Sequence, residues 1–367
     1  MTPRIIKLFP AIFLILYLLV VFKPFLINGL LPIPADTIVG MYHPWRDNYL
    51  DQYPNGIPFK NSLITDAVRQ QYPWRQVAIE QLKNWQMPTW NPYSFSGYPL
   101  LANFQSAPFY PLNFIYWLTS FPLGWSLQVI FQILLGGIFM WLFLKNLKLR
   151  DEAIALGVIS WVGSGFFVSW LETNVVVQSV IWLPLVLFSI DRRKGWLLTL
   201  SLISGFFAGH LQIFGYVLLT SIFYIFYRRY WKGFLYPLIT FVLTFFWWLP
   251  AAKFILLSAR NVDQVVWQKP DWFLPWQNLS QLIAPDFFGN PATGNYFGIW
   301  NYGEFIGYIG IVGLLFSLVS LLGKIKQARF FVGIFVISAL FALPTIISSV
   351  PFVLNIPFIS SSQPSRL

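Results

Sequence analysis

The sequence predicts an all-α polytopic membrane protein, and three observations lead to this prediction. The 367 residues are 57% hydrophobic and only 10% charged, with a mean hydropathy of +0.62, which leaves too little polar surface to coat a soluble globule. Apolar runs long enough to cross about 30 Å of hydrocarbon recur through the chain. Between these runs, Lys and Arg gather in short clusters, as they do in loops that stay in the cytoplasm.

We expect about nine transmembrane helices, with a range of about 8 to 11. The first extends from about Ile5 to Leu31 and resembles a signal anchor, because Arg4 and Lys7 precede it and no small-residue cleavage site follows it. The other apolar runs predict spans at residues 125–144, 153–171, 175–190, 196–209, 211–227, 233–257, 305–322 and 330–350. Polar turns such as Glu172–Asn174 could instead mark helices that dip into the bilayer and return.

The positions of the charges predict the orientation. With the N-terminus in the cytoplasm, the predicted inner segments contain 14 of the 24 basic residues and 3 of the 13 acidic residues. They therefore hold the whole formal net charge of +11, and the outer segments balance to zero. The inner basic residues are Arg4, Lys7, Lys145, Lys148, Arg150, Arg192, Arg193, Lys194, Arg228, Arg229, Lys232, Lys324, Lys326 and Arg329.

This layout predicts one integral domain, residues 1–367, in the plasma membrane. It has two long extracytoplasmic loops, residues 32–107 and 258–304. The partner expected from the basic clusters is the lipid bilayer rather than nucleic acid, because the clusters sit at the ends of apolar spans. The chain has no Cys, which excludes thiolate catalysis, and it has no P-loop, HExxH or GxSxG motif.

A pattern occurs twice in the predicted first outer loop. Asp36 is followed by His43-Pro44-Trp45-Arg46, and Asp66 is followed by Tyr72-Pro73-Trp74-Arg75. A carboxylate, an aromatic ring and a guanidinium together suit a sugar or a phosphate, because rings stack on sugar faces and Arg binds phosphate oxygens in pairs. The alternative interpretation is an interfacial belt of aromatic residues with turns at the prolines.

The pattern at Asp66 continues into a longer run, which comprises Asp66–Arg75, Met87–Pro92, Ser96–Leu100 and Ala102–Pro111. This run resembles the first extracytoplasmic loop of the bacterial YfhO-type membrane proteins, which belong to the GT-C group of lipid-linked-sugar glycosyltransferases. Later segments resemble the same family, namely Glu172-Thr173-Asn174 with Gln178, Gly209-His210-Leu211-Gln212 with Tyr216, and Gly303–Gly313.

The resemblance implies a GT-C-like fold, a polyprenyl-phosphate sugar donor, and a catalytic Asp in the first outer loop. Asp66 matches that Asp by position, and Asp36 is the alternative because it lies closer to the first span. The residues expected to bind the donor phosphate are Arg69, Arg75 and His210. Those expected to bind substrate are Trp74, Trp90, Asn91, Gln105, Glu172 and Gln212. For His210 and Glu172, the alternative is a polar group that reaches headgroup water.

The second long loop combines acidic residues with many Trp and Asn side chains, a composition typical of carbohydrate-binding surfaces. Its acidic residues are Asp263, Asp271, Asp286 and Glu304. The alternative is a packed outer loop with aromatic anchors. No metal-ligand cluster has diagnostic spacing, although carboxylates would suit Mg²⁺ or Mn²⁺.

The sequence therefore predicts a glycosyltransferase that moves a sugar from a polyprenyl-phosphate donor to an extracytoplasmic acceptor, such as a cell-envelope glycan, teichoic acid or protein. One alternative is a transporter or flippase for a lipid-linked glycan. Its spans should carry ionisable residues near their centres. Here, apart from Lys23 and Lys253 near predicted outer ends, the spans have no Asp, Glu, Lys or Arg at their centres. A non-catalytic membrane assembly protein is the other alternative. We also expect the natural reading frame to continue past Leu367.

Overall fold

The computed structural model describes residues 3–54, 65–258, 272–323, 325–354, 356 and 362–366. It is mostly helical, and the strands among these residues are β1 (Trp90–Asn91) and β2 (Tyr98–Pro99), which pair antiparallel with Trp90 opposite Pro99. The predicted all-α class is therefore confirmed.

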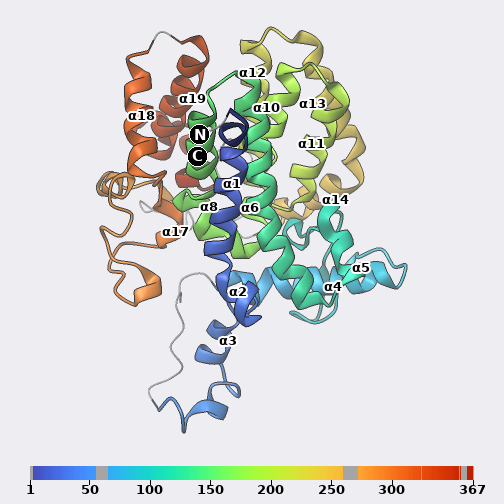
Figure 1. Ribbon diagram of the computed structural model, residues 1–367. Coiled ribbons are helices and arrows are strands. Elements are labelled where there is room, and N and C mark those ends of the chain that lie inside the picture. The colour runs from blue at the N-terminus through green and yellow to red at the C-terminus, as the bar shows by residue number, and fades with distance from the viewer. Residues whose placement is uncertain are drawn as a thin grey trace.

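The helices form an upright bundle, and the short elements of the first loop lie below it in Figure 1. The helix bounds are α1 Pro3–Val21, α2 Lys23–Asn28, α3 Asp36–Met41, α4 Tyr72–Lys83, α5 Ile115–Leu118, α6 Phe121–Asn146, α7 Asp151–Val162, α8 Gly165–Trp170, α9 Val176–Val180, α10 Leu183–Asp191, α11 Gly195–Phe207, α12 Leu211–Tyr227, α13 Leu235–Leu243, α14 Phe245–Leu256, α17 Tyr302–Phe305, α18 Ile311–Leu321, α19 Lys326–Ala342 and α20 Ile346–Val353.

Between one and four membrane spans are supported by helix length and composition in the described part of the chain. There, α6 is the helix that is long and apolar enough to cross a membrane by itself. Three helix pairs reach that length only together, and they bend by 41° after Val162, by 73° after Leu243 and by 108° after Leu321. The chain thus has at least one helix suited to a membrane, but the expected nine spans are not confirmed.

The breaks within two of these pairs have local causes. The Ser164 hydroxyl accepts a hydrogen bond from the backbone N–H of Phe167 at 3.3 Å and so begins α8 as a new helix. The Thr244 hydroxyl donates to the carbonyl of Thr240 at 2.8 Å, where α13 ends and α14 begins. Short polar side chains thus redirect the backbone within apolar runs, which hydropathy alone does not reveal.

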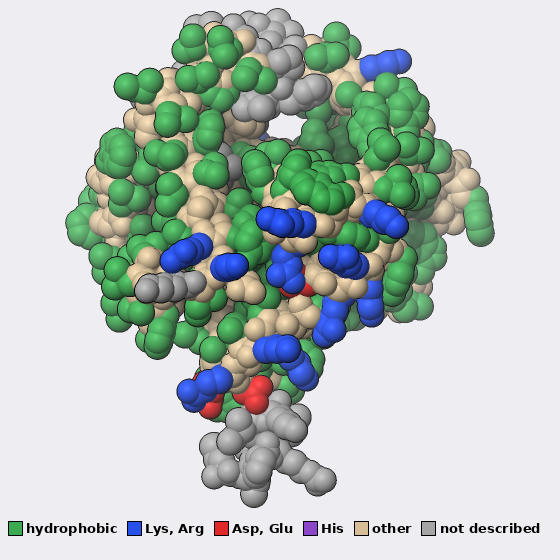
Figure 2. All heavy atoms as spheres, turned by 90° about the horizontal axis from the view of Figure 1, so that it is seen from above, with side chains coloured by type: hydrophobic (Ala, Val, Ile, Leu, Met, Phe, Trp, Pro, Cys, Tyr) green, Lys and Arg blue, Asp and Glu red, His purple; other side chains and the backbone are tan. Residues whose placement is uncertain are grey.

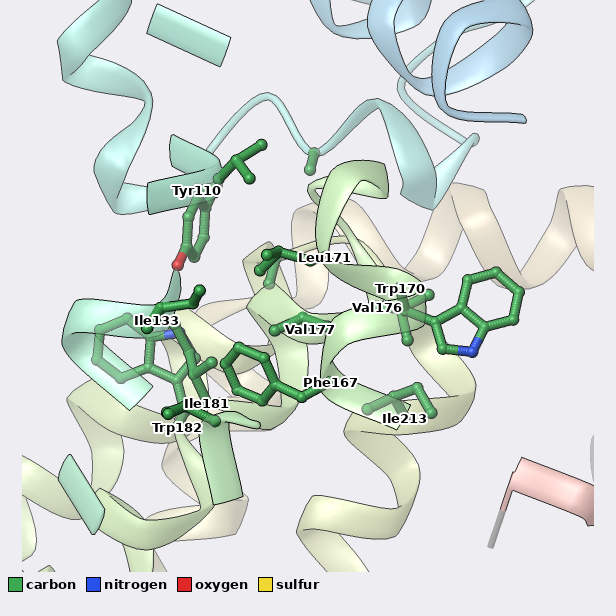
Figure 3. Close-up of a cluster of buried hydrophobic side chains, with 14 of the residues drawn as sticks. Tyr110, Ile133, Phe167, Trp170, Leu171, Val176, Val177, Ile181, Trp182 and Ile213 are labelled. Atoms are coloured by element: carbon green, nitrogen blue, oxygen red, sulfur yellow. The ribbon is translucent and has the colours of Figure 1, made fainter. Parts of the chain in front are cut away.

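Two adjacent glycines let other helices approach α6 closely. A Cβ at Gly137 would lie 2.6 Å from a methyl carbon of Leu14 in α1, and one at Gly136 would lie 3.2 Å from the ring of Phe167 in α8. Small residues at such crossings bring helix backbones together. Around α6, buried side chains from the first loop and from α8 to α10 form one hydrophobic cluster, part of which is drawn in Figure 3.

That cluster fixes the end of the first loop onto the bundle. Tyr110, which follows the expected loop 32–107, is buried with Ile133 of α6, Ile181 and Trp182. Within the loop, a π-helical turn, residues 67–71, leads into α4, and β1 pairs with β2. The end of the loop is therefore packed, and buried contacts set its position relative to the helices.

Candidate functional site

A group of polar side chains gathers where the first loop meets several helix ends. We call it the polar cluster and define it as Asp66, His210, Gln212, Tyr216, Glu304 and Arg366. These residues come from the start of the π-helical turn, from the N-terminal part of α12, from α17 and from a 3₁₀ turn at Pro364–Arg366. Segments far apart in the sequence thus form one site.

The centre of the polar cluster is the ion pair between Arg366 and Glu304. The guanidinium donates from Nε to Oε2 at 2.7 Å and from Nη2 to Oε1. The side chains are 15% and 4% exposed, respectively, so water screens the pair weakly. Arg366 also lies 5.2 Å from the ring centre of Trp170, whose indole N–H donates to the carbonyl of Gly303 at 2.9 Å. A carboxylate and an aromatic face thus fix the guanidinium.

The surroundings keep Arg366 positively charged. Burial by itself would lower the pKa of Arg366. The hydrogen bonds and the charge of Glu304 raise this pKa and outweigh burial, and nearby Tyr216 and Asp66 raise it further. The pKa of Arg366 is consequently raised above its ordinary value. Since the Asp66 carboxylate contributes to that shift, it lies within electrostatic reach of the guanidinium.

His210 begins α12 and lies beside Arg366. Its Nδ1 accepts from the backbone N–H of Ile213 at 3.3 Å, and its own backbone N–H donates to the Ser179 hydroxyl at 3.2 Å. Nε2 is 3.4 Å from Nη1 of Arg366. A neutral imidazole that accepts at Nδ1 carries its proton on Nε2, so this nitrogen is a donor and its approach to Arg366 is a packing contact.

Gln212 and Tyr216 hold the segment that carries Arg366. The Gln212 amide donates to the Tyr216 hydroxyl at 2.7 Å and to the carbonyl of Gln363 at 2.5 Å. From the other side, the indole N–H of Trp272 donates to the carbonyl of Ser362 at 2.7 Å. Recognition of two consecutive main-chain carbonyls fixes residues 362–366 against α12, which aims the Arg366 side chain at Glu304.

Asp66 stands at the entry to the π-helical turn and is exposed. Its Oδ1 accepts from the Gln70 side-chain amide at 3.0 Å. In the same turn, the Gln71 amide donates to Oε1 of Gln105 at 2.7 Å, which ties the turn to the later part of the loop. Arg69 is exposed and lies 5.4 Å from the ring centre of Tyr42. Asp66 is therefore linked to the polar cluster by its electrostatic interaction with Arg366, and Gln105 is linked to the same turn through Gln71.

Arg75 has a different environment from the one expected of a phosphate ligand. It is 0% exposed, and its guanidinium donates only to uncharged oxygens, which are the carbonyls of Ser106 (2.6 Å) and Asn174 (3.2 Å) and the side-chain oxygens of Asn113 (3.1 Å) and Gln128 (3.4 Å). Burial lowers the pKa of Arg75. In this arrangement the residue binds the loop to the bundle and presents no N–H to a ligand, so the expected phosphate contact finds no support.

Asp36, Trp74, Trp90 and Asn91 lie on elements that contribute no residue to the polar cluster. Asp36 is exposed at the start of α3, which projects below the bundle in Figure 1. Trp90 is half-exposed on β1 beside the buried Asn91, and Trp74 packs edge-on against Tyr98 at 6.4 Å.

Among the acidic candidates, Glu172 is exposed in the turn after α8. In the second loop, Asp286 accepts from the Tyr302 hydroxyl at 2.8 Å. Asp263 and Asp271 fall outside the described residues. Three or more His, Asp or Glu side chains able to hold a metal ion are not found together in the described residues. The Mg²⁺ or Mn²⁺ considered from the sequence stays a prediction.

Sequence reasoning did not assign Arg366 to the site and placed Glu304 only in a general carbohydrate-binding loop. Their pairing spans 62 residues, a distance over which no sequence period operates. One signal was present: Arg366 is an isolated basic residue after the last apolar run, on the side that the sequence predicts to lack basic clusters. An isolated arginine at such a position indicates a specific partner.

Comparison of the chain with protein-family models, with curated proteins and with solved structures finds no match. The resemblance to YfhO-type proteins therefore stays a prediction, and the function has to be inferred from the residues of this chain and their arrangement.

Proposed function

We propose that this protein is a GT-C-like membrane glycosyltransferase that moves a sugar from a polyprenyl-phosphate donor to an extracytoplasmic acceptor. The observation that supports it most strongly is the meeting of an exposed carboxylate, Asp66, with a charged guanidinium, Arg366, and an imidazole, His210, beside the end of an apolar helix. Transfer from a lipid phosphate needs a base, groups that offset phosphate charge, and access from the bilayer.

In the proposed reaction, Asp66 acts as the general base. Its carboxylate accepts the proton of an acceptor hydroxyl as that oxygen forms a bond to the anomeric carbon of the donor sugar. The bond between this carbon and the phosphate oxygen breaks, and its electron pair leaves with the polyprenyl phosphate. A single displacement of this kind inverts the anomeric configuration. The exposure of Asp66 fits this role, because the base must reach an incoming acceptor.

Arg366 and His210 would offset the charge that develops on the departing phosphate. Glu304 binds Nε and Nη2 of Arg366, which leaves Nη1, on the side of His210, as the edge that can face a phosphate oxygen. His210 would donate from Nε2 to a second oxygen. Preorganised donors of this kind favour the transition state because they need no reorientation when the charge appears.

The apolar helices supply the route for the lipid. α12, whose N-cap is His210, exposes large apolar side chains such as Leu219 and Phe223, and α13 exposes Leu238 and Phe241. A polyprenyl chain lying along such a surface would bring its phosphate to the helix end where Arg366 and His210 lie. In this proposal the protein is a multi-pass plasma-membrane protein with a cytoplasmic N-terminus, and Asp66 faces the extracytoplasmic side.

The test is to incubate the purified protein, reconstituted in lipid, with a panel of polyprenyl-phosphate sugars and candidate acceptors, and to follow the release of free polyprenyl phosphate. We expect release with at least one donor, dependent on an acceptor and on Asp66. Binding of donors without release, in a protein that retains its fold, would contradict the proposal and favour a lipid-linked-glycan transporter.

A further inference from the structure

Three turns at one end of the bundle place a basic residue where glycine is the usual choice. Lys148 follows α6 with φ 58°, Arg193 follows α10 with φ 52°, and Arg229 follows α12 with φ 49°. A Cβ is strained in this left-handed conformation, so helix ends normally use glycine or asparagine there. Six uncharged residues also have positive φ, namely Trp85, Phe95, Ser96, Ala107, Asn174 and Trp300, so the feature to explain is that the three at this end of the bundle are all cationic.

The main-chain hydrogen bonds that close two of these turns do not involve the side chains, although Arg193 also lies 5.6 Å from the ring centre of Tyr230. After Arg193, the backbone N–H of Lys194 donates to the carbonyl of Ser189 at 2.9 Å, and after Arg229 that of Tyr230 donates to the carbonyl of Ile225 at 3.0 Å. These bonds close both helix ends through the main chain alone. Glycine would make the same bonds with less strain.

The buried carboxylate of Asp191 connects the three helix ends that precede these turns. The Asp191 side chain is 1% exposed, and its Oδ1 accepts from Nε of Arg228 at 2.7 Å and from the Tyr224 hydroxyl at 2.8 Å. Its Oδ2 accepts from the Asn146 amide at 2.8 Å. These hydrogen bonds hold the ends of α6, α10 and α12 together. Lys148, Arg193 and Arg229, which follow these ends, therefore lie on one surface.

This surface has a large positive excess. Figure 2 shows Lys and Arg side chains gathered on the face that carries these turns. Among the described residues, Asp191 pairs with Arg228, and Glu152 pairs with Arg150 at 3.3 Å. The described basic residues of this face that are exposed and that form no ion pair with a described carboxylate are Lys145, Lys148, Arg192, Arg193, Lys194, Arg229, Lys232, Lys326 and Arg329.

We propose that this face binds the phosphate headgroups of anionic phospholipids. Arg and Lys are the side chains that suit phosphodiester oxygens, and basic residues at the membrane surface attract anionic lipid. Exposed apolar side chains lie alongside the cations, namely Phe226, Trp231 and Leu235. A soluble polyanion would contact only the basic side chains. A phospholipid would bind the basic side chains with its headgroup and contact the apolar residues with its acyl chains.

The experiment compares thermal unfolding of the full chain in phosphatidylcholine nanodiscs with and without phosphatidylglycerol. We expect the Tm of the wild type to rise by several degrees with phosphatidylglycerol. The triple variant Lys148→Gly, Arg193→Gly, Arg229→Gly should have a Tm close to that of the wild type in phosphatidylcholine, because the relief of strain in three turns offsets the lost contact of Arg193 with Tyr230. It should lose most of the rise with phosphatidylglycerol. Bound lipid is counted in parallel by native mass spectrometry.

The matched control is Ser96→Gly, which relieves the same strain in an exposed outer turn, φ 63°, without removing charge. It should keep the full rise. Three results would each overturn the proposal: equal Tm in both lipids for the wild type, a full rise in the triple variant, or the same rise from inorganic phosphate added to phosphatidylcholine nanodiscs, which would indicate a free-anion site. None of these outcomes depends on glycosyltransferase activity.

Discussion

Arg366 donates to both carboxylate oxygens of Glu304, with 2.7 Å between Nε and Oε2. The two residues lie 62 positions apart, and both side chains are largely removed from water. The pair therefore joins α17 to the segment 362–366 and sets where the guanidinium can act. This contact joins two segments that are separate in the sequence into one site with Asp66 and His210.

We predict that Arg366→Met destabilises the protein by about 3–5 kcal/mol, because it leaves the Glu304 carboxylate buried without a partner. The double variant Arg366→Met, Glu304→Gln should recover most of this loss, since neither charge remains. Denaturant unfolding in detergent of the two single variants and the double variant completes a double-mutant cycle. Additive losses would show that the two side chains are not energetically coupled.

Arg75→Met should cost about 3–5 kcal/mol of unfolding free energy, because four buried oxygens lose the guanidinium and only those of Asn113 and Gln128 keep another donor. The matched control is Arg69→Met, six residues away on an exposed surface, which should change stability by no more than about 0.5 kcal/mol. Limited proteolysis between residues 65 and 110 reports the same effect locally. Equal stability of the two variants would contradict the anchoring role that we assign to Arg75.

The orientation can be tested with single cysteines, because the chain contains none. We predict that a cysteine at Lys148 or Arg193 reacts with a membrane-impermeant maleimide only after cells are permeabilised. A cysteine at Asp66 or Asp286 should react in intact cells. The opposite pattern would reverse the orientation and move the polar cluster to the cytoplasmic side.

Composition was enough to predict the helical class, but it did not predict the helix breaks. Hydropathy averages over apolar runs, and the hydroxyls of Ser164 and Thr244 redirect the backbone inside them. Nor does the expected run 305–322 form one helix, since α18 begins only after Gly310, φ 88°. Local hydrogen bonds and a positive φ, rather than hydrophobicity, decide where these helices begin and end.

The candidate site was predictable only where local sequence determines the environment. Asp66, His210 and Gln212 stand at element ends, which sequence patterns locate. The two Pro-Trp-Arg segments look alike, yet Arg46 is exposed whereas Arg75 is buried. This difference arises because elements distant in sequence supply oxygens to Arg75. Partners of that kind are known only from the folded structure, which is also why Arg366 was missed.

The central claim is that Asp66 is the base in sugar transfer, and the most direct measurement is the rate of polyprenyl-phosphate release by Asp66→Asn in lipid. Asn keeps the size of the side chain but cannot accept the proton, so turnover should fall about 10²–10⁴-fold with little change in donor affinity. Asp36→Asn, in the similar segment, should retain wild-type turnover. Two results would contradict the role of Asp66 as the base: an inactive Asp36→Asn variant together with an active Asp66→Asn variant, or turnover within a few fold of wild type in both variants.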